Sequence, residues 1–253
     1  MAAQTADHAS DAEAARPGLR RSIALFRAFR VEQTDPDRFY GMLADDSIRQ
    51  LRRFTDLSGQ RVLDVGGGPG YFSRAFRAAG VTYSTVESDV GELAGRTEPE
   101  PGSVIGTALA LPFRTGAVDV CYSSNVLEHV PDPWVMGDEM VRVTRSGGLI
   151  YLSFTNWLSP WGGHETSPWH YTGGDRAARR YVRQNGHLPK NLFGRSLFAV
   201  SVRDALRWAR SRTDADLLAA FPRYHPWWAH GLVRVPGVRE VATWNLALVL
   251  RRR

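Results

Sequence analysis

Cysteine, lysine and long apolar runs are scarce in this sequence of 253 residues, which has one cysteine, Cys121, and one lysine, Lys190. A single cysteine excludes a disulfide within the chain and is typical of a cytosolic protein. Because Cys121 lies in the apolar segment VDVCYSS, we expect a packed thiol rather than a nucleophile. No apolar run reaches the roughly 18 residues that indicate a transmembrane helix.

The N-terminal residues also lack a targeting signal. Residues 1–20 are rich in Ala, Asp and Gln but have no basic start followed by an apolar stretch, so they do not resemble a secretory signal. We expect a disordered tail over residues 1–20, a single domain over residues 21–253 and a cytoplasmic location.

The charge is divided unevenly along the chain. From Arg176 to Arg253 there are sixteen basic and four acidic residues, a net charge of +12, whereas the rest has sixteen basic and twenty-two acidic residues, a net charge of −6. A basic surface suits nucleic acid, anionic lipid headgroups or a phosphorylated substrate, so peripheral contact with a membrane is one hypothesis. The alternative is an ordinary solvated surface.

A glycine-rich turn follows a short apolar run in the segment RVLDVGGGPGYF, residues 61–72. Glycine lets the backbone approach a ligand without a Cβ clash, so the segment predicts a binding loop after a buried strand. The dinucleotide pattern GxGxxG is absent because Tyr71 stands three positions after Gly68, and the phosphate-loop pattern GxxxxGK[ST] is absent as well. With Asp64 before the turn, the loop suits a cationic or amine-bearing ligand better than a phosphate.

This segment resembles motif I of the class I S-adenosylmethionine-dependent methyltransferases. Glu87 ends a second predicted strand roughly 20 residues after the glycines, the spacing at which a βαβ unit returns a carboxylate to a ribose. The resemblance implies that Glu87 holds both ribose hydroxyls. Residues 106–133 resemble the later motifs of the small-molecule branch, with Thr107 where the family usually has Asp. The adenine contact then falls to the Thr107 hydroxyl or to the Ala108 backbone.

The resemblance implies S-adenosylmethionine as the cofactor. It places this molecule against the glycine turn, the ends of the first, second and fourth predicted strands and the loop after residue 106. The implied cofactor-binding residues are Asp64, Gly66, Gly67, Gly68, Gly70, Phe72, Glu87, Ser88, Thr107, Ala108, Leu109, Ser123, Ser124 and Asn125.

Apolar spacing predicts helices that alternate with strands. Helices are expected over residues 22–29, 39–54, 72–79 and 202–210, and from near Trp134 to the segment 146–148; strands are expected over 62–65, 82–86, 103–105, 118–122, 149–154, 216–221 and 245–250. Such alternation predicts an α/β protein with a parallel, doubly wound sheet. The resemblance implies a Rossmann-like, seven-stranded, mostly parallel sheet with helices on both faces, in which the last two strands add an antiparallel pairing.

Two stretches, residues 155–200 and 222–243, lie outside the expected sheet, at places where the family carries substrate-specific insertions. They are rich in tryptophan and histidine, which suits a cap over a cofactor pocket. We expect the substrate to contact Trp161, Glu165, Trp169, Tyr171, His225 and Trp228. As general bases we consider His164, His170 and His129, with a structural role as the alternative for each.

Glu128 and His129 follow the fourth predicted strand in the segment VLEHV. Quinone-pathway O-methyltransferases resemble this stretch and use a Glu-x-x-Glu-His arrangement for a divalent metal. Asn125 stands here in place of the first Glu, and its carbonyl oxygen is a weaker ligand. We therefore predict no metal site, with Glu128 orienting the loop and the cofactor.

The favoured function is O-methylation of a small-molecule, glycan or lipid-like acceptor, which rests on analogy. One alternative is a nucleic-acid methyltransferase, but the Asp/Asn-Pro-Pro-aromatic motif of the amino-nitrogen enzymes is replaced by Ser-Ser-Asn-Val, and no dedicated nucleic-acid module is recognised. A non-catalytic S-adenosylmethionine-binding scaffold is the other alternative.

Overall fold

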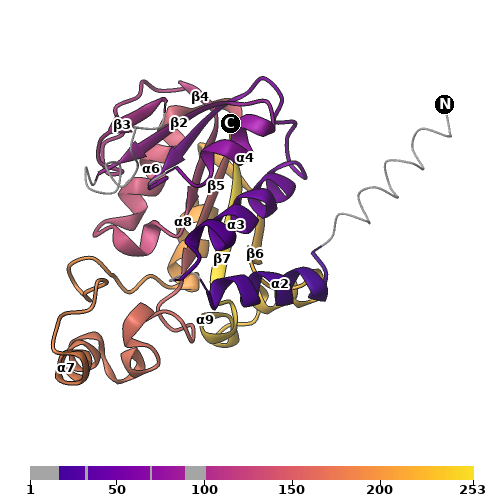
Figure 1. Ribbon diagram of the computed structural model, residues 1–253. Coiled ribbons are helices and arrows are strands. Elements are labelled where there is room, and N and C mark those ends of the chain that lie inside the picture. Colours follow the sequence, from indigo (N-terminus) through magenta and orange to yellow (C-terminus); the bar gives the residue numbers. More distant parts are fainter. Residues whose placement is uncertain (1–16, 32–33, 69, 89–100) are drawn as a thin grey trace.

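A seven-stranded sheet crosses the centre of the computed structural model, which describes residues 17–31, 34–68, 70–88 and 101–253 (Figure 1). In spatial order the strands are β3 (Ser103–Ile105), β2 (Thr82–Glu87), β1 (Arg61–Val65), β4 (Val118–Ser124), β5 (Thr144–Thr155), β7 (Asn245–Arg252) and β6 (Ala215–Pro222). Strands β1 to β5 pair in parallel, whereas β7 runs antiparallel to both of its neighbours. The predicted Rossmann-like fold, with its antiparallel last strand, is confirmed.

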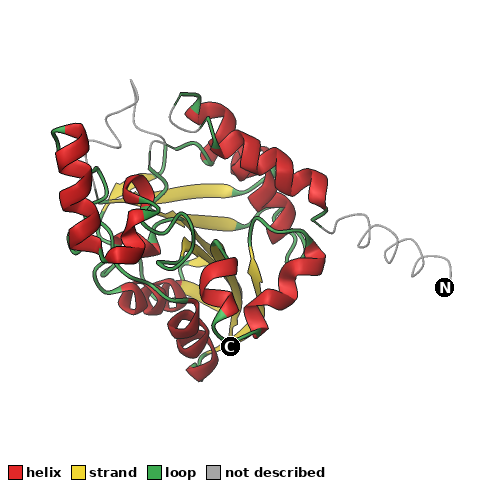
Figure 2. Ribbon diagram, turned by 90° about the horizontal axis from the view of Figure 1, so that it is seen from below, coloured by secondary structure: helices red, strands yellow, loops and turns green. Residues whose placement is uncertain are grey.

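Helices cover both faces of the sheet, as Figure 2 shows from below. One face carries α2 (Leu19–Phe29), α3 (Pro36–Leu51) and α4 (Ser73–Ala78), and the other carries α6 (Pro133–Val143) and α8 (Val202–Ser211). Successive strand residues point to opposite faces, so in β1 Val62 joins the core formed with Leu43 while Leu63 joins the core formed with Met140. Because both faces are buried, most residues of the central strands are apolar, and the polar exceptions such as Asp64 and Ser123 are buried as well.

The two expected insertions fold into short helices at one end of the molecule. The first contains η2 (His164–Thr166), η3 (Trp169–Thr172) and α7 (Gly174–Asn185), and the second contains η4 (Trp227–Arg234) and α9 (Val238–Ala242). Helix α7 lies apart from the sheet and packs on η2 and η3 (Figure 1). The sequence patterns did not predict α7, because it has few apolar side chains to mark a helical period.

Most predicted boundaries lie within three residues of the observed ones, but two features differ from the prediction. Helix α6 ends at Val143 instead of reaching the glycines at 147 and 148, and β5 begins at Thr144. Thr144 takes an extended conformation (φ −76°, ψ 137°), its hydroxyl donates to the Met140 carbonyl at 2.7 Å, and it pairs with Val118. Sheet pairing therefore starts earlier than the glycines suggested.

The other difference concerns the N-terminus. Helix α2 begins at Leu19, inside the expected disordered tail, whereas residues 1–16 lie outside the described part of the chain. None of the described helices is long and apolar enough to cross a membrane.

The strand order reverses between β1 and β4, which are neighbours although β2 and β3 come between them in the chain. At such a reversal the connections that follow the two neighbouring strands run in opposite directions along the sheet, which leaves a crevice at the carboxyl ends of the strands. Val65, Glu87 and Ser124 end the strands β1, β2 and β4 at this edge.

Candidate functional site

The turn after β1 is built so tightly that its glycines are required. Gly66 has a φ of +76° and donates its N–H to the Val86 carbonyl at 2.8 Å, which holds the turn against the end of β2. A Cβ at Gly67 would lie 2.3 Å from Thr85 Oγ1. The backbone of this turn therefore lies directly on β2, with no room for side chains on that side.

Glu87 joins the end of β2 to the same turn. Its Oε2 accepts a hydrogen bond from the Gly68 N–H at 3.1 Å, and its Oε1 accepts one from the Ser88 N–H at 2.8 Å. The carboxylate predicted to hold a ribose is thus oriented by two backbone donors beside the glycine turn. Spacing along the sequence correctly indicated that the two features meet.

Asp64 is buried beneath the turn, and its Oδ2 accepts a hydrogen bond from the Tyr83 hydroxyl at 2.7 Å. Burial and, to a smaller extent, the charge of Glu87 raise the pKa of Asp64 to about 7, against the opposing effects of Tyr83 and Arg223. A carboxyl group with this pKa changes its protonation readily when a cation binds nearby.

The serines that end β4 hold the strands together. Ser123 is buried and donates to the Val65 carbonyl at 2.8 Å, whereas the Ser124 hydroxyl accepts from Arg223 at 2.5 Å. Both side chains predicted to bind the cofactor therefore have hydrogen-bond partners within the chain.

Asn125, the next residue, has a φ of +58° and is tied to the second insertion. Its Oδ1 accepts from Asn245 Nδ2 at 2.6 Å, and its Nδ2 donates to the Tyr224 hydroxyl at 3.4 Å. Asn245 was not among the predicted site residues, because only the pairing of β7 with β5 brings it to this edge.

The loop after β3 also returns to this edge. The Gly106 N–H donates to the Glu87 carbonyl at 3.0 Å, and the Thr107 hydroxyl accepts from the Leu109 N–H at 3.2 Å. The Thr107 side chain thus shapes a local turn. Its contact with adenine, and that of Ala108, stay predictions.

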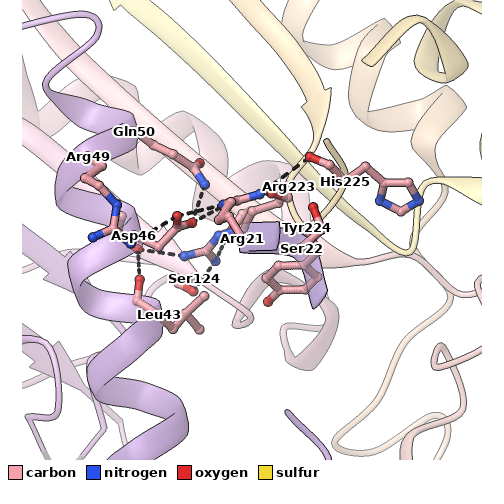
Figure 3. Close-up of polar contacts among 12 residues, drawn as sticks. Arg21, Ser22, Leu43, Asp46, Arg49, Gln50, Ser124, Arg223, Tyr224 and His225 are labelled. Atoms are coloured by element: carbon pink, nitrogen blue, oxygen red, sulfur yellow. Dashed lines mark hydrogen bonds and ion pairs between the residues drawn. The ribbon is translucent and has the colours of Figure 1, made fainter. Parts of the chain in front are cut away.

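A fully buried arginine, Arg223, lies beside this edge and was missed by sequence reasoning (Figure 3). Its guanidinium donates at 2.5 to 3.2 Å to four hydroxyl groups, those of Ser47, Tyr122, Ser124 and Ser153. No sequence signal marked it, because these partners come from three separate elements, α3, β4 and β5, and Arg223 lies directly after the end of β6.

A second arginine anchors helix α2 to this cluster. Arg21 donates to the Arg223 carbonyl at 2.9 Å and forms an ion pair with Asp46, which also accepts from Gln50 at 2.7 Å (Figure 3). Burial raises the pKa of Asp46, but the hydrogen bond and charge of Arg21 outweigh this effect, so the pKa lies below its ordinary value. Helix α2 is thus fixed next to Arg223, beside the carboxyl edge of the sheet.

Three titratable side chains meet where the first insertion leaves the sheet: Glu128 and His129 from η1 (Leu127–His129), and His164 from η2. One potential ligand atom of each lies within 4.8 Å of the other two. The rings of His129 and His164 meet edge to face with centroids 5.0 Å apart. Burial lowers the pKa of His164 to about 4, against the opposing charge of Glu128.

His170, the third predicted base, is held differently. It is buried, its Nε2 lies 3.1 Å from the Ser159 carbonyl, and its ring contacts Tyr171 and Trp157 with centroids 4.1 and 5.2 Å apart. Burial lowers its pKa as well. These contacts give His170 a part in the packing of the first insertion.

The predicted substrate residues fall into two groups. In the first insertion, Trp169 and Tyr171 are exposed, with the Arg180 guanidinium 3.8 Å from the centroid of the Trp169 ring. Glu165 in this group accepts from Asn191 Nδ2 at 2.9 Å.

The second group lies beside helix α2. Trp161 and His225 both pack on Trp244, with ring centroids 6.3 and 4.9 Å apart, and Trp161 also contacts Phe29 at 5.4 Å. Trp228 is 64% exposed. Trp161 of the first insertion and His225 of the second thus meet on Trp244.

Comparisons with known proteins agree with this geometry. A family model described as a methyltransferase domain matches residues 63–152. An uncharacterized methyltransferase of Mycolicibacterium gilvum is 58% identical over 253 residues, which cover 96% of this chain and 98% of the relative.

Two solved structures share the fold at low sequence identity. An S-adenosylmethionine-dependent methyltransferase from Mesorhizobium loti aligns with a TM-score of 0.56 at 17% identity and covers 82% of this chain and 98% of its own. Geranyl diphosphate C-methyltransferase from Streptomyces coelicolor, solved with Mg²⁺, geranyl diphosphate and S-adenosyl-L-homocysteine, aligns with a TM-score of 0.53 at 15% identity and covers 82% and 77%.

Proposed function

Since this chain belongs to the class I S-adenosylmethionine-dependent methyltransferases, we propose that it transfers a methyl group to a hydroxyl of a small-molecule, glycan or lipid-like acceptor. The cofactor is S-adenosylmethionine, which supplies an electrophilic methyl group when bound.

The donor side of this proposal rests on the glycine turn and Glu87. The turn offers backbone groups without side chains in the way, and Glu87 is already oriented by the Gly68 and Ser88 N–H groups. Asp64 adds a carboxyl group beneath the turn that suits the positive charge of a sulfonium. These features fit the cofactor, and the other residues implied by the resemblance stay proposed contacts.

The observation that carries the hydroxyl acceptor is the cluster of Glu128, His129 and His164 next to the end of β4. A hydroxyl is a poor nucleophile until its proton is removed, whereas many carbon and nitrogen acceptors need no such help. Glu128 Oε2 and His164 Nε2 are buried and have no hydrogen-bond partner among the described residues. Basic atoms are thus available beside the expected methyl group. As general base we favour His164, whose Nε2 has no partner among the described residues, over His170, whose two ring nitrogens lie near the Ser159 carbonyl and the Ser167 hydroxyl.

The nucleic-acid alternative is supported only by the basic C-terminal third, and part of that charge is used inside the chain. Arg223 is fully buried, Arg212 pairs with Asp214 at 2.8 Å, and Arg253 pairs with Asp216 at 2.5 Å. Paired and buried arginines contribute little to a phosphate-binding surface. We therefore rank this alternative below the small-molecule acceptor.

Transfer of a labelled methyl group tests the proposal. The chain is incubated with labelled S-adenosylmethionine and separate lipid, glycan, small-metabolite and nucleic-acid fractions of a mycobacterial extract, with Glu87→Ala as the donor-binding control. We expect an alkali-stable methyl ether in one of the first three fractions, and much less product from Glu87→Ala at the same low concentration of S-adenosylmethionine. Label in nucleic acid would contradict the acceptor class. Donor binding without product in any fraction would support the scaffold alternative.

A further inference from the structure

Glu128, His129 and His164 are separated in the sequence but meet at the junction of the sheet and the first insertion. Glu128 and His129 follow β4, and His164 comes 35 positions after His129, beyond β5. Their potential ligand atoms lie within 4.8 Å of one another. The predicted absence of a metal site followed from Asn125 at the position of the first Glu. The Asn125 side chain is bound to Asn245, whereas His164 reaches the cluster from a distant segment.

Two polar atoms of this cluster are buried without a hydrogen-bond partner among the described residues. Glu128 is 0% exposed, and its Oε2, like His164 Nε2, has no hydrogen-bond partner within the described ranges. An unpaired buried polar group costs about 1–3 kcal/mol, and a charged group costs more. A cation between the two atoms removes both penalties, because each offers a lone pair.

The remaining contacts orient these atoms as metal ligands. His129 Nδ1 lies 2.6 Å from the Ser196 carbonyl, which can only accept, so Nδ1 carries the proton and Nε2 keeps its lone pair. Glu128 Oε1 accepts from the Thr155 N–H at 2.9 Å, which leaves Oε2 for a second partner. A backbone carbonyl on the far nitrogen is the usual support of a metal-bound histidine.

His164 is held in this position by an unusual backbone. Its φ is +49°, a left-handed conformation that is unfavourable for a residue with a side chain. The preceding glycines permit the tight bend: a Cβ at Gly162 would lie 2.0 Å from the Trp157 carbonyl oxygen, and one at Gly163 would lie 2.5 Å from His170 Cβ. Backbone strain of this kind is often retained where a side chain must point into a site.

We propose that Glu128, His129 and His164 bind a divalent transition metal of the Zn²⁺ type and leave coordination positions open. Two imidazoles and one carboxylate form a donor set that suits Zn²⁺ better than Mg²⁺, which prefers oxygen ligands. Tetrahedral ligands at about 2.0–2.2 Å from zinc lie roughly 3.3–3.6 Å apart. The ligand atoms therefore need to move closer by at most about 1.2–1.5 Å from the 4.8 Å limit seen here.

The role of this metal in catalysis rests on the proposed function, whereas the binding site does not. A cation here lowers the pKa of an acceptor hydroxyl beside the methyl donor. The hydroxyl proton passes to solvent, the oxygen lone pair forms the bond to the methyl carbon, and the carbon–sulfur bond breaks, so the sulfonium becomes a neutral thioether. Glu128, His129 and His164 then act as ligands, not as free bases.

The test measures metal binding directly on the full chain after treatment with a chelator. Zn²⁺ is titrated by calorimetry, and Co²⁺ by its visible absorption, which is intense for tetrahedral coordination. We expect one ion per chain. His164→Asn and Glu128→Gln should each weaken binding at least about 100-fold through loss of a ligand, and the exposed His187→Asn serves as the matched control.

Both variants are chosen to preserve the fold. Asn tolerates the left-handed conformation at position 164, and Gln keeps an oxygen for the Thr155 N–H. Thermal unfolding of the metal-free variants verifies this. Absence of stoichiometric binding by the unmodified chain, or equal binding by folded His164→Asn and Glu128→Gln, would overturn the metal site. Transfer to a hydroxyl that is equally fast with and without metal would overturn its catalytic role only, and a metal-loaded chain that methylates only nitrogen or carbon would overturn the proposed acceptor instead.

Discussion

Glu87 Oε2 accepts a hydrogen bond from the Gly68 N–H across 3.1 Å, and this contact joins the ends of two neighbouring parallel strands. Both partners lie at the edge where the strand order reverses. Because the second oxygen accepts from the Ser88 N–H, the carboxylate is held in one orientation before any ligand arrives. Such an oriented group loses little side-chain entropy when it binds a ribose.

Glu87→Ala should therefore weaken binding of S-adenosylmethionine. A hydrogen bond to a charged group contributes about 1.5–3 kcal/mol, which corresponds to about 10- to 150-fold in the dissociation constant. Glu87→Gln keeps one acceptor oxygen and should lose less. Calorimetric titration measures both, with Asp216→Asn in the exposed pair with Arg253 as the control. Unchanged affinity in Glu87→Ala would remove this residue from the donor site.

Gly67→Ala and Gly68→Ala separate steric exclusion from backbone conformation. A Cβ at Gly67 would lie 2.3 Å from Thr85 Oγ1, whereas Gly68 has open space around it but a φ of +54°. We expect each substitution to lower the free energy of unfolding by about 1–3 kcal/mol. Thr85→Ala should restore part of the loss in Gly67→Ala and none of it in Gly68→Ala. Urea denaturation of the single and double variants measures this coupling, and additive effects in both pairs would refute the steric explanation.

Arg223→Met should destabilise the chain by about 2 kcal/mol, because the hydroxyls of Ser124 and Ser153 lose a buried donor. Removing the buried charge itself offsets part of that cost, since methionine has no charge to desolvate. The exposed Arg210→Met should change stability by less than about 0.5 kcal/mol. Chemical denaturation compares the two, and equal effects would mean that the Arg223 network contributes no net stability.

Asp64 should make donor binding depend on pH near neutrality. Its pKa is raised from 3.8 to about 7, so it is largely protonated in the free chain at pH 6, and a bound sulfonium favours the ionised form. Affinity for S-adenosylmethionine should rise by up to about tenfold per pH unit below the pKa and level off above it. Calorimetry between pH 6 and 8 measures the slope, which Asp64→Asn should remove. A slope that persists in Asp64→Asn would assign the proton to another group.

The raised pKa of Asp64 also predicts that the free energy of unfolding of the cofactor-free chain falls as the pH rises, a trend opposite to that of cofactor affinity. The folded chain holds a proton that the unfolded chain has lost between pH 3.8 and about 7. The stabilisation from this carboxyl group is therefore fully present below 3.8 and disappears as the pH rises through 7. Comparing the pH dependence of unfolding in the unmodified chain and Asp64→Asn isolates this contribution.

Local features of the sequence predicted the fold and the meeting of the glycine turn with Glu87. The strand before the glycine turn and the strand that ends in Glu87 have the expected positions, and the structure brings turn and carboxylate together. The strand, the glycine turn and the following strand lie close together in the sequence, and steric limits on the backbone allow few arrangements of such a unit. The start of β5 was placed wrongly, because Thr144 is drawn into the sheet by its pairing with Val118, a contact invisible along the chain.

The sequence by itself determined the sheet, the glycine turn and the identity of the methyl donor, since turn chemistry and strand spacing act over short distances. Only the tertiary structure decided that Arg223 is buried among four hydroxyls and that His164 meets Glu128 and His129. Those contacts join segments far apart in the chain and exist only because β5, β6 and β7 carry the insertions back to the carboxyl edge of the sheet.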